Sequence, residues 1–158
     1  MTNSKQPALL FPGSFDPFTL GHASLVQRAI DLWGPLVIAV GYNEEKQGWL
    51  PVEERVRALR EYYKDEPRVS VEAYTGLTTD FAERIGARAI LRGLRSVKDY
   101  EYELHMADVN RRLTGVETVI LFTEPHLSAL SSSVVRELAS FGRDVQEFLP
   151  AGLTYNIP

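Results

Sequence analysis

The sequence predicts an α/β protein with a doubly wound sheet of five parallel strands, in a single domain that spans residues 1–158. Short runs rich in Val, Ile and Leu alternate with segments of helical periodicity. The runs show little polar alternation, as is typical of strands buried on both faces. With 158 residues, 44% of them hydrophobic, the chain is long enough for one compact domain and leaves little room for a second.

The expected strands and helices follow in order along the chain. The five apolar runs lie at residues 8–11, 36–41, 69–73, 89–91 and 118–122. Between them, apolar residues share one helical face, namely Leu25, Val26, Ala29, Ile30 and Trp33 in the first helix and Val52, Val56, Leu59 and Tyr63 in the second. Later helices are expected from Asp99 to near Leu113 and through Val134, Val135 and Leu138.

This alternation predicts a Rossmann-like topology, in which ligands bind beyond the carboxyl ends of the strands, where the strand order reverses. We therefore expect the chemistry in the loops that follow strands. The chain contains neither a G-x-G-x-x-G fingerprint nor a phosphate loop ending in Gly-Lys-Ser/Thr. Hydride transfer and kinase chemistry therefore lack their usual support.

Composition excludes several classes of partner. Seventeen basic against twenty-one acidic residues give a net charge of −4, so there is no global positive field for nucleic acid or an anionic membrane. The chain has no cysteine, which is compatible with a reducing compartment. No signal peptide is recognised at the start, and no apolar run approaches the roughly 18 to 20 residues of a membrane helix. A cytoplasmic location is expected.

The loop after the first strand, residues 12–22, is dense in glycine and proline and opens the first helix near His22. Gly13 and Gly21 permit close backbone approach, and a helix start presents N–H groups to an anion. A phosphate site is expected, where His22 could stabilise charge on a transferring phosphoryl group. The alternative is that His22 only caps the helix in a tight turn.

Three further loops carry candidate residues, each with a structural alternative. Lys46 follows the second strand and could reach a phosphate or be an ordinary solvated lysine. Arg92 and Arg95 follow the fourth strand and could bind phosphate oxygens or pair with an acid such as Asp99. The serines at 131–133 open the last helix, where capping and clasping of phosphates are compatible.

These strings resemble the phosphopantetheine adenylyltransferase branch of the nucleotidyltransferase superfamily. Thr19-Leu20-Gly21-His22 is similar to the T/H-x-G-H signature, within a longer Pro-Gly-Ser-Phe-Asp-Pro string. Arg-Gly-Leu-Arg-x-x-x-Asp-Tyr-Glu-Tyr-Glu from Arg92 is the more specific feature, and Leu-Ser-Ser-Ser-Val-Val-Arg resembles the third signature. The resemblance spans about residues 8 to 150 and implies transfer of AMP from ATP to 4′-phosphopantetheine, which gives dephospho-coenzyme A and pyrophosphate.

The resemblance also implies a role for each matching residue. The catalytic residues would be His22, Lys46 and Arg95, acting by charge stabilisation without a protein nucleophile. Phosphopantetheine would be bound by Ser14, Lys46, Thr78 and Arg92. The residues implied for ATP are Ser14, Phe15, His22, Gly93, Leu94, Arg95, Glu103, Leu127, Ser128, Ala129, Leu130, Ser131, Ser132 and Ser133.

The same resemblance implies Mg²⁺ bound mainly through the ATP phosphates with no metal site in the protein, a homohexamer, and coenzyme A as a possible feedback ligand. One stretch departs from the pattern, since Leu127-Ser128-Ala129 stands where relatives have an aromatic residue and then Ser-Phe. The alternatives are another adenylyl- or cytidylyltransferase, acting for example on nicotinate mononucleotide or glycerol phosphate, and a catalytically silent nucleotide-sensing module.

Overall fold

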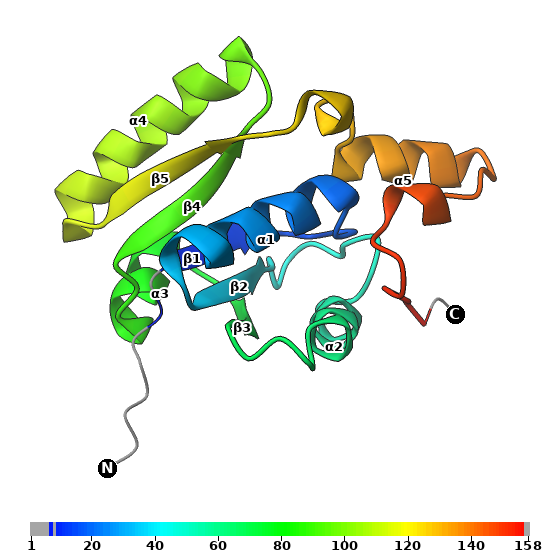
Figure 1. Ribbon diagram of the computed structural model, residues 1–158, viewed down its shortest axis with the longest axis horizontal. Helices are drawn as coiled ribbons and strands as arrows, with labels where there is room; N and C mark the ends of the chain where they lie inside the picture. Colours follow the sequence, from blue (N-terminus) through cyan, green and yellow to red (C-terminus); the bar gives the residue numbers. More distant parts are fainter. Residues whose placement is uncertain (1–6, 8, 157–158) are drawn as a thin grey trace.

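The computed structural model describes residue 7 and residues 9–156, in which strands and helices alternate along the chain (Figure 1). The strands are β1 (Leu9–Gly13), β2 (Leu36–Gly41), β3 (Val69–Tyr74), β4 (Ala89–Leu94) and β5 (Glu117–Phe122). The α-helices are α1 (Leu20–Trp33), α2 (Val52–Tyr62), α3 (Thr78–Ile85), α4 (Val97–Thr114) and α5 (Ser132–Ser140), and two short 3-10 helices are η1 (Pro125–Leu127) and η2 (Gln146–Phe148).

The five strands form one parallel sheet in the order β3-β2-β1-β4-β5. The chain runs outward from β1 to β3 and then returns to place β4 on the other side of β1. This confirms the predicted Rossmann-like topology. The strand order reverses between β1 and β4, so the carboxyl ends of these two strands are where a ligand site is expected.

The strand predictions are confirmed with shifted ends, and β4 shows why. It continues to Leu94, three residues past the predicted end, because Arg92, Gly93 and Leu94 still pair with β5. The apolar pattern stops earlier than the hydrogen bonds do, since Arg92 and Gly93 leave the core and line a cleft. Residue 8 of the first predicted strand lies outside the described residues.

Helices cover both faces of the sheet. One core cluster joins β1 and β2 to α1 and α2 through residues such as Phe11, Ile30, Ile38 and Leu59. The other cluster lies on the opposite face, where Leu10 and Ile90 alternate with those positions along the strands and pack with Phe81 of α3. Alternate strand residues therefore point to opposite faces, as a doubly wound sheet requires.

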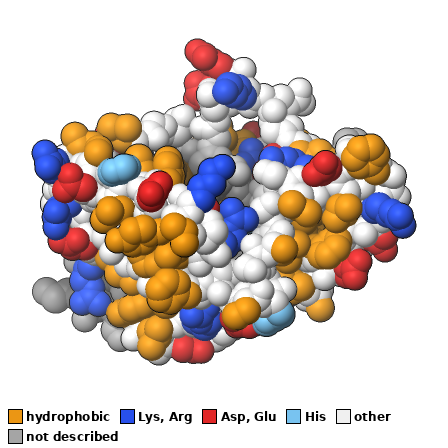
Figure 2. Space-filling view, turned by 90° about the horizontal axis from the view of Figure 1, so that it is seen from above, with side chains coloured by type: hydrophobic (Ala, Val, Ile, Leu, Met, Phe, Trp, Pro, Cys, Tyr) orange, Lys and Arg blue, Asp and Glu red, His pale blue; other side chains and the backbone are white. Residues whose placement is uncertain are grey.

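Helix α4 is unusual because, of its eighteen residues, Glu103 is the one that is buried. Its exposed apolar side chains include Tyr102, Met106, Val109 and Leu113, which recur at intervals of three and four residues. Figure 2 shows hydrophobic side chains gathered over this side of the molecule. In the described part of the chain no helix is both long and apolar enough to span a bilayer.

Candidate active site

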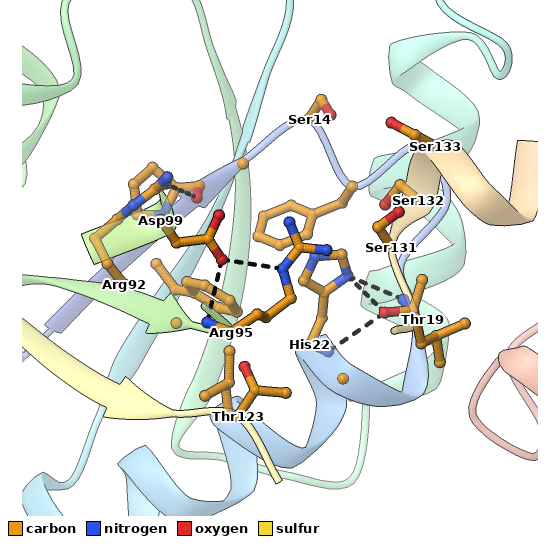
Figure 3. Close-up of a pocket in the computed structure, with 18 of the residues that line it drawn as sticks. Ser14, Thr19, His22, Arg92, Arg95, Asp99, Thr123, Ser131, Ser132 and Ser133 are labelled. Carbon is orange, nitrogen blue, oxygen red and sulfur yellow. Dashed lines mark hydrogen bonds and ion pairs between the residues drawn. The ribbon is translucent and has the colours of Figure 1, made fainter. Parts of the chain in front are cut away.

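A cleft of about 430 Å³ opens at the carboxyl ends of β1 and β4, at the switch point of the sheet (Figure 3). Its walls come from the β1–α1 loop, the end of β4, the start of α4 and the N-terminus of α5. Most residues predicted for ATP line it, namely Ser14, Phe15, His22, Gly93, Arg95, Glu103, Leu130, Ser131, Ser132 and Ser133. Arg92 also lines it.

His22 both caps α1 and lines the cleft, so capping does not exclude a role in the site, which stays a prediction. Helix α1 begins at Leu20 with Thr19 as its N-cap. The Thr19 N–H donates to His22 Nδ1 at 3.0 Å, and the His22 N–H donates weakly to Thr19 Oγ1 at 3.5 Å. This is a capping box with histidine in the position usual for Glu or Gln. Because Nδ1 accepts, the proton of the neutral ring lies on Nε2.

Three phenylalanine rings enclose the His22 imidazole. Its ring centroid lies 5.0 Å from that of Phe15, 5.4 Å from that of Phe18 and 6.2 Å from that of Phe11. Burial in this aromatic box, and then the charges of Arg95 and Arg92, lower the pKa of His22 to about 4. At neutral pH the imidazole is therefore uncharged, and it can donate a hydrogen bond without acting as a cation.

An NMR titration tests this electrostatic description. In the unligated protein the His22 ring should remain neutral from pH 7 down to near pH 4. The unfolded chain takes up this proton near pH 6.5, so the folded state loses stability as the pH falls from 6.5 towards 4. In Arg95→Met the pKa of His22 should rise by less than the whole shift, because burial is the larger cause. A ring that titrates near 6.5 would contradict the description.

The loop that carries Phe15 is held in a strained shape. Phe15 has φ 47°, in the left-handed region that residues other than glycine rarely adopt. Such a residue costs of the order of 1–3 kcal/mol and persists only where its surroundings fix it. Phe15 is buried, and its ring lies 5.1 Å from Phe11 and 5.5 Å from Phe18. The strain is thus stored beside His22, within the aromatic box.

Buried charges tie this loop to the segment before α2. The Asp16 carboxylate accepts the N–H groups of Trp49 and Leu50, each at 2.8 Å. The buried Arg55 guanidinium donates to the carbonyls of Ser14 at 2.6 Å and Leu50 at 3.1 Å. These bonds cross from the first loop to the second, so the two loops are positioned as one unit.

Helix α5 holds the same loop from the other side. The Ser132 hydroxyl donates to the Pro17 carbonyl at 2.7 Å, and Arg136 Nη1 donates to the Asp16 carbonyl at 2.7 Å. Ser131 is the N-cap of α5 and accepts the Val134 N–H at 3.2 Å. The capping role of the serines is therefore present, and the positive end of the α5 dipole faces the cleft beside that of α1.

Arg92 of β4 and Arg95, just after its end, both have acidic partners from α4. Arg92 binds the Glu103 carboxylate through Nε at 2.9 Å and Nη2 at 2.7 Å. Arg95 Nε lies 3.3 Å from Asp99 Oδ2, which also accepts the Arg95 N–H at 3.1 Å. The ion pairs of the structural alternative are therefore present, and Glu103, predicted to contact ATP, is bound to Arg92. Phosphate binding by the two arginines stays a prediction. These pairs orient the guanidinium groups, which still line the cleft.

A second hollow of about 350 Å³ adjoins the cleft at the ends of β1, β2 and β3. Pro12, Gly13, Ser14 and Arg92 line both spaces. Thr78, predicted for phosphopantetheine, lines the second hollow, where its hydroxyl lies 2.8 Å from the Tyr74 hydroxyl. Two substrates placed in these hollows would therefore meet at Ser14 and Arg92.

Some predicted site residues are not brought together. Lys46 is exposed in the turn after β2 and lines neither hollow, although Asn43 of the same turn lines the second. Leu94 contributes to a different hollow, beside Arg95 and Tyr100. The segment 127–129, at the end of η1 and after it, lies outside the lining of the cleft. A role for these residues stays a prediction.

Asp99, Thr123, Tyr102 and Arg136 also line the cleft, although they were absent from the predicted site. Three of these had a signal in the sequence. Asp99 stands four residues after Arg95, the spacing of a helical ion pair. Arg136 closes the Leu-Ser-Ser-Ser-Val-Val-Arg string. Tyr102 lies within the string that begins at Arg92. Thr123 had no such signal, because its place depends on how the end of β5 packs beside β4.

Comparison with known proteins places the chain among nucleotidyltransferases. A family model described as cytidylyltransferase-like matches residues 10–138. Proteins named phosphopantetheine adenylyltransferase from Bacteroides fragilis and Phocaeicola vulgatus are 51% and 52% identical to it over 144 residues. These alignments cover 91% of this chain and 96% and 95% of the relatives.

A solved structure supports the fold alone. The lipopolysaccharide core biosynthesis protein from Thermoplasma volcanium superposes with a TM-score of 0.52 at 19% identity, covering 73% of this chain and 94% of that protein.

Proposed function

This chain belongs to the phosphopantetheine adenylyltransferase family, and we propose that it transfers AMP from ATP to 4′-phosphopantetheine, a step of coenzyme A biosynthesis. The products are dephospho-coenzyme A and pyrophosphate. The observation that carries the proposal is the pair of adjoining hollows that share Ser14 and Arg92, in a chain about half identical to its relatives over nine-tenths of its length.

ATP would bind in the cleft beside His22. Two helix N-termini, those of α1 and α5, favour the negative triphosphate there. Arg95 adds a fixed charge held by Asp99. The acceptor would occupy the second hollow, with its phosphate near Ser14 and Arg92 and its arm toward Thr78. Lys46, on the exposed turn beside this hollow, would swing onto the phosphate when the substrates bind.

The chemistry requires no protein nucleophile. A phosphate oxygen of 4′-phosphopantetheine attacks the α-phosphorus of ATP in line, and the bond from that phosphorus to the β-phosphate oxygen breaks as pyrophosphate leaves. The chain's part is to position both phosphates and to stabilise the charge that develops between them. His22 would donate its Nε2 proton as a hydrogen bond to an α-phosphate oxygen without transferring it.

Mg²⁺ would enter with ATP, and this family typically uses it in that way. Within residue 7 and residues 9–156, no group of three or more His, Asp or Glu side chains could hold a metal ion. The two carboxylates of the cleft, Asp99 and Glu103, are bound to arginines. The residues therefore fit an ion carried by phosphate oxygens, which neutralises charge on the triphosphate.

The direct test offers purified protein ATP, Mg²⁺ and 4′-phosphopantetheine while pyrophosphate and dephospho-coenzyme A are measured. Both products should form in equal amounts. Nicotinate mononucleotide and glycerol phosphate serve as control acceptors and should give no product. Turnover with either of them instead would show a different nucleotidyltransferase, and ATP binding without any product would show a silent nucleotide-binding module. Coenzyme A added to the same assay should compete for the cleft.

We also propose a cytoplasmic homohexamer whose contacts use the exposed face of α4. An exposed apolar stripe on one face of α4 supports this assignment, and it consists of Tyr102, Met106, Val109 and Leu113. Light scattering should give six times the 17.8 kDa chain mass. Val109→Glu, in the middle of the stripe, should reduce this mass, whereas Lys98→Glu on the same helix should not. A wild-type monomer, or a hexamer unchanged by Val109→Glu, would contradict this assignment.

A further inference from the structure

The last described segment of the chain packs against α2 and reaches the loop that opens α1. Leu149 and Leu153 are buried, and Leu153 belongs to the core cluster of α1 and α2. Arg57 Nη2 donates to the Thr154 carbonyl at 3.0 Å, and the Asn156 N–H donates to the Glu54 carboxylate. In Figure 1 this segment, drawn in red, runs from α5 down toward α2.

The segment ends in a contact with the first loop. The Tyr155 hydroxyl accepts the N–H of Phe18 at 3.0 Å, across a separation of 137 residues. Tyr155 is partly buried, and burial, together with the nearby Asp16 and Glu54 carboxylates, raises the pKa of its phenol to about 12. The hydroxyl is thus neutral. It is the hydrogen-bond partner of the Phe18 N–H, which would otherwise be unpaired beside the aromatic box.

Phe18 and Thr19 are adjacent, and their amides point to two different partners. The Phe18 N–H is held by Tyr155, while the Thr19 N–H is held by His22 Nδ1. The Phe18 ring is fully buried and lies 5.4 Å from the His22 ring. A shift of the Phe18 backbone would therefore move both the wall on which the imidazole packs and the donor that fixes its tautomer.

We propose that Tyr155 is a positioning residue for adenylyl transfer, which fixes the ring and tautomer of His22 through the backbone of Phe18. The proposal rests on the proposed function of the site. Without the hydroxyl, the Phe18 N–H loses its partner, and a buried unpaired N–H is unfavourable enough to shift the loop toward another one. A misplacement of about 1 Å at a reacting centre reduces turnover by about one to two orders of magnitude.

The test is Tyr155→Phe in the full chain, compared with Tyr63→Phe. The Tyr63 ring also packs on Phe18, with centroids 6.1 Å apart, but within the described residues its hydroxyl makes no hydrogen bond to the loop. Both variants lose one phenol oxygen. Assayed well below the unfolding midpoints of both, Tyr155→Phe should show kcat lowered about tenfold with KM for ATP within about twofold, and Tyr63→Phe should match the wild type.

A second readout does not depend on catalysis. With ¹⁵N-labelled histidine, the wild-type His22 ring should show the Nε2–H tautomer, and Tyr155→Phe should show mixed tautomers or exchange broadening. Wild-type kcat, or a lowered kcat with unchanged His22 signals, would overturn the proposal. If the wild-type protein transfers no adenylyl group, the proposed function fails, and the ring signals still decide whether Tyr155 positions His22.

Discussion

Replacing His22 by alanine is expected to lower kcat roughly 10²–10³-fold while the dissociation constant of ATP changes by less than about threefold. The imidazole is neutral and lies in a box of three phenylalanine rings, so it adds little attraction for the ground-state triphosphate. The hydrogen bond from its Nε2 proton strengthens only in the transition state, when negative charge builds on the α-phosphate oxygens. The loss should therefore fall on turnover, measured in steady state, while calorimetry measures ATP binding.

A matched control separates this role from a loss of structure. His105 is exposed on α4 and lines neither hollow, so His105→Ala should leave both quantities unchanged. The His22 side chain also caps α1, and its removal should lower stability by about 1 kcal/mol. Assays far below the unfolding midpoint remove that contribution. Equal losses in kcat and in ATP affinity would mean that His22 binds the ground state and would contradict the assigned role.

Arg92→Met is expected to abolish most activity and to destabilise the fold as well. Arg92 lines both hollows and is bound to the Glu103 carboxylate, whose side chain is 8% exposed. Removing the guanidinium leaves that carboxylate without its partner, which should cost roughly 2 kcal/mol and lower the unfolding midpoint by several degrees. The kcat/KM for 4′-phosphopantetheine should fall by at least about 10²-fold, because the acceptor phosphate loses a fixed charge.

The double variant Arg92→Met/Glu103→Met separates the two effects. With both partners replaced by apolar side chains of similar size, the unpaired charge is gone and most of the stability should return. The activity should not return, since the charge facing both substrates is still missing. Calorimetric unfolding and the product assay measure the two quantities on the same samples. Recovery of activity together with stability would show that Arg92 has a structural role only.

Much of the fold could be predicted because it depends on local patterns. The apolar run of β2, which includes Ile38, predicts a strand buried on both faces. The spacing of apolar residues from Leu25 to Trp33 predicts the buried face of α1. The site loops also followed from the fold, since parallel strands end at the same edge. His22 lies far along the chain from Arg92 and Arg95, and the structure brings these three residues to one cleft, as expected.

What could not be predicted depends on contacts between distant residues. The hydrogen bond of Arg136 with the Asp16 carbonyl joins residues 120 positions apart, and that of Tyr155 with the Phe18 N–H joins residues 137 positions apart. No local sequence pattern predicts such bonds. Lys46 shows the converse. Its turn follows β2 as expected, but the sequence does not set the direction of a flexible side chain on an exposed turn, and Lys46 lines neither hollow.

The central claim is that the cleft and the adjoining hollow hold the two halves of one product. A crystal structure of the complex with dephospho-coenzyme A tests it most directly. The account predicts the adenosine half beside His22 and Arg95, the pantetheine arm near Thr78, and the linking phosphates at Ser14 and Arg92. A product bound elsewhere on the sheet, or lying wholly within one hollow, would contradict the account.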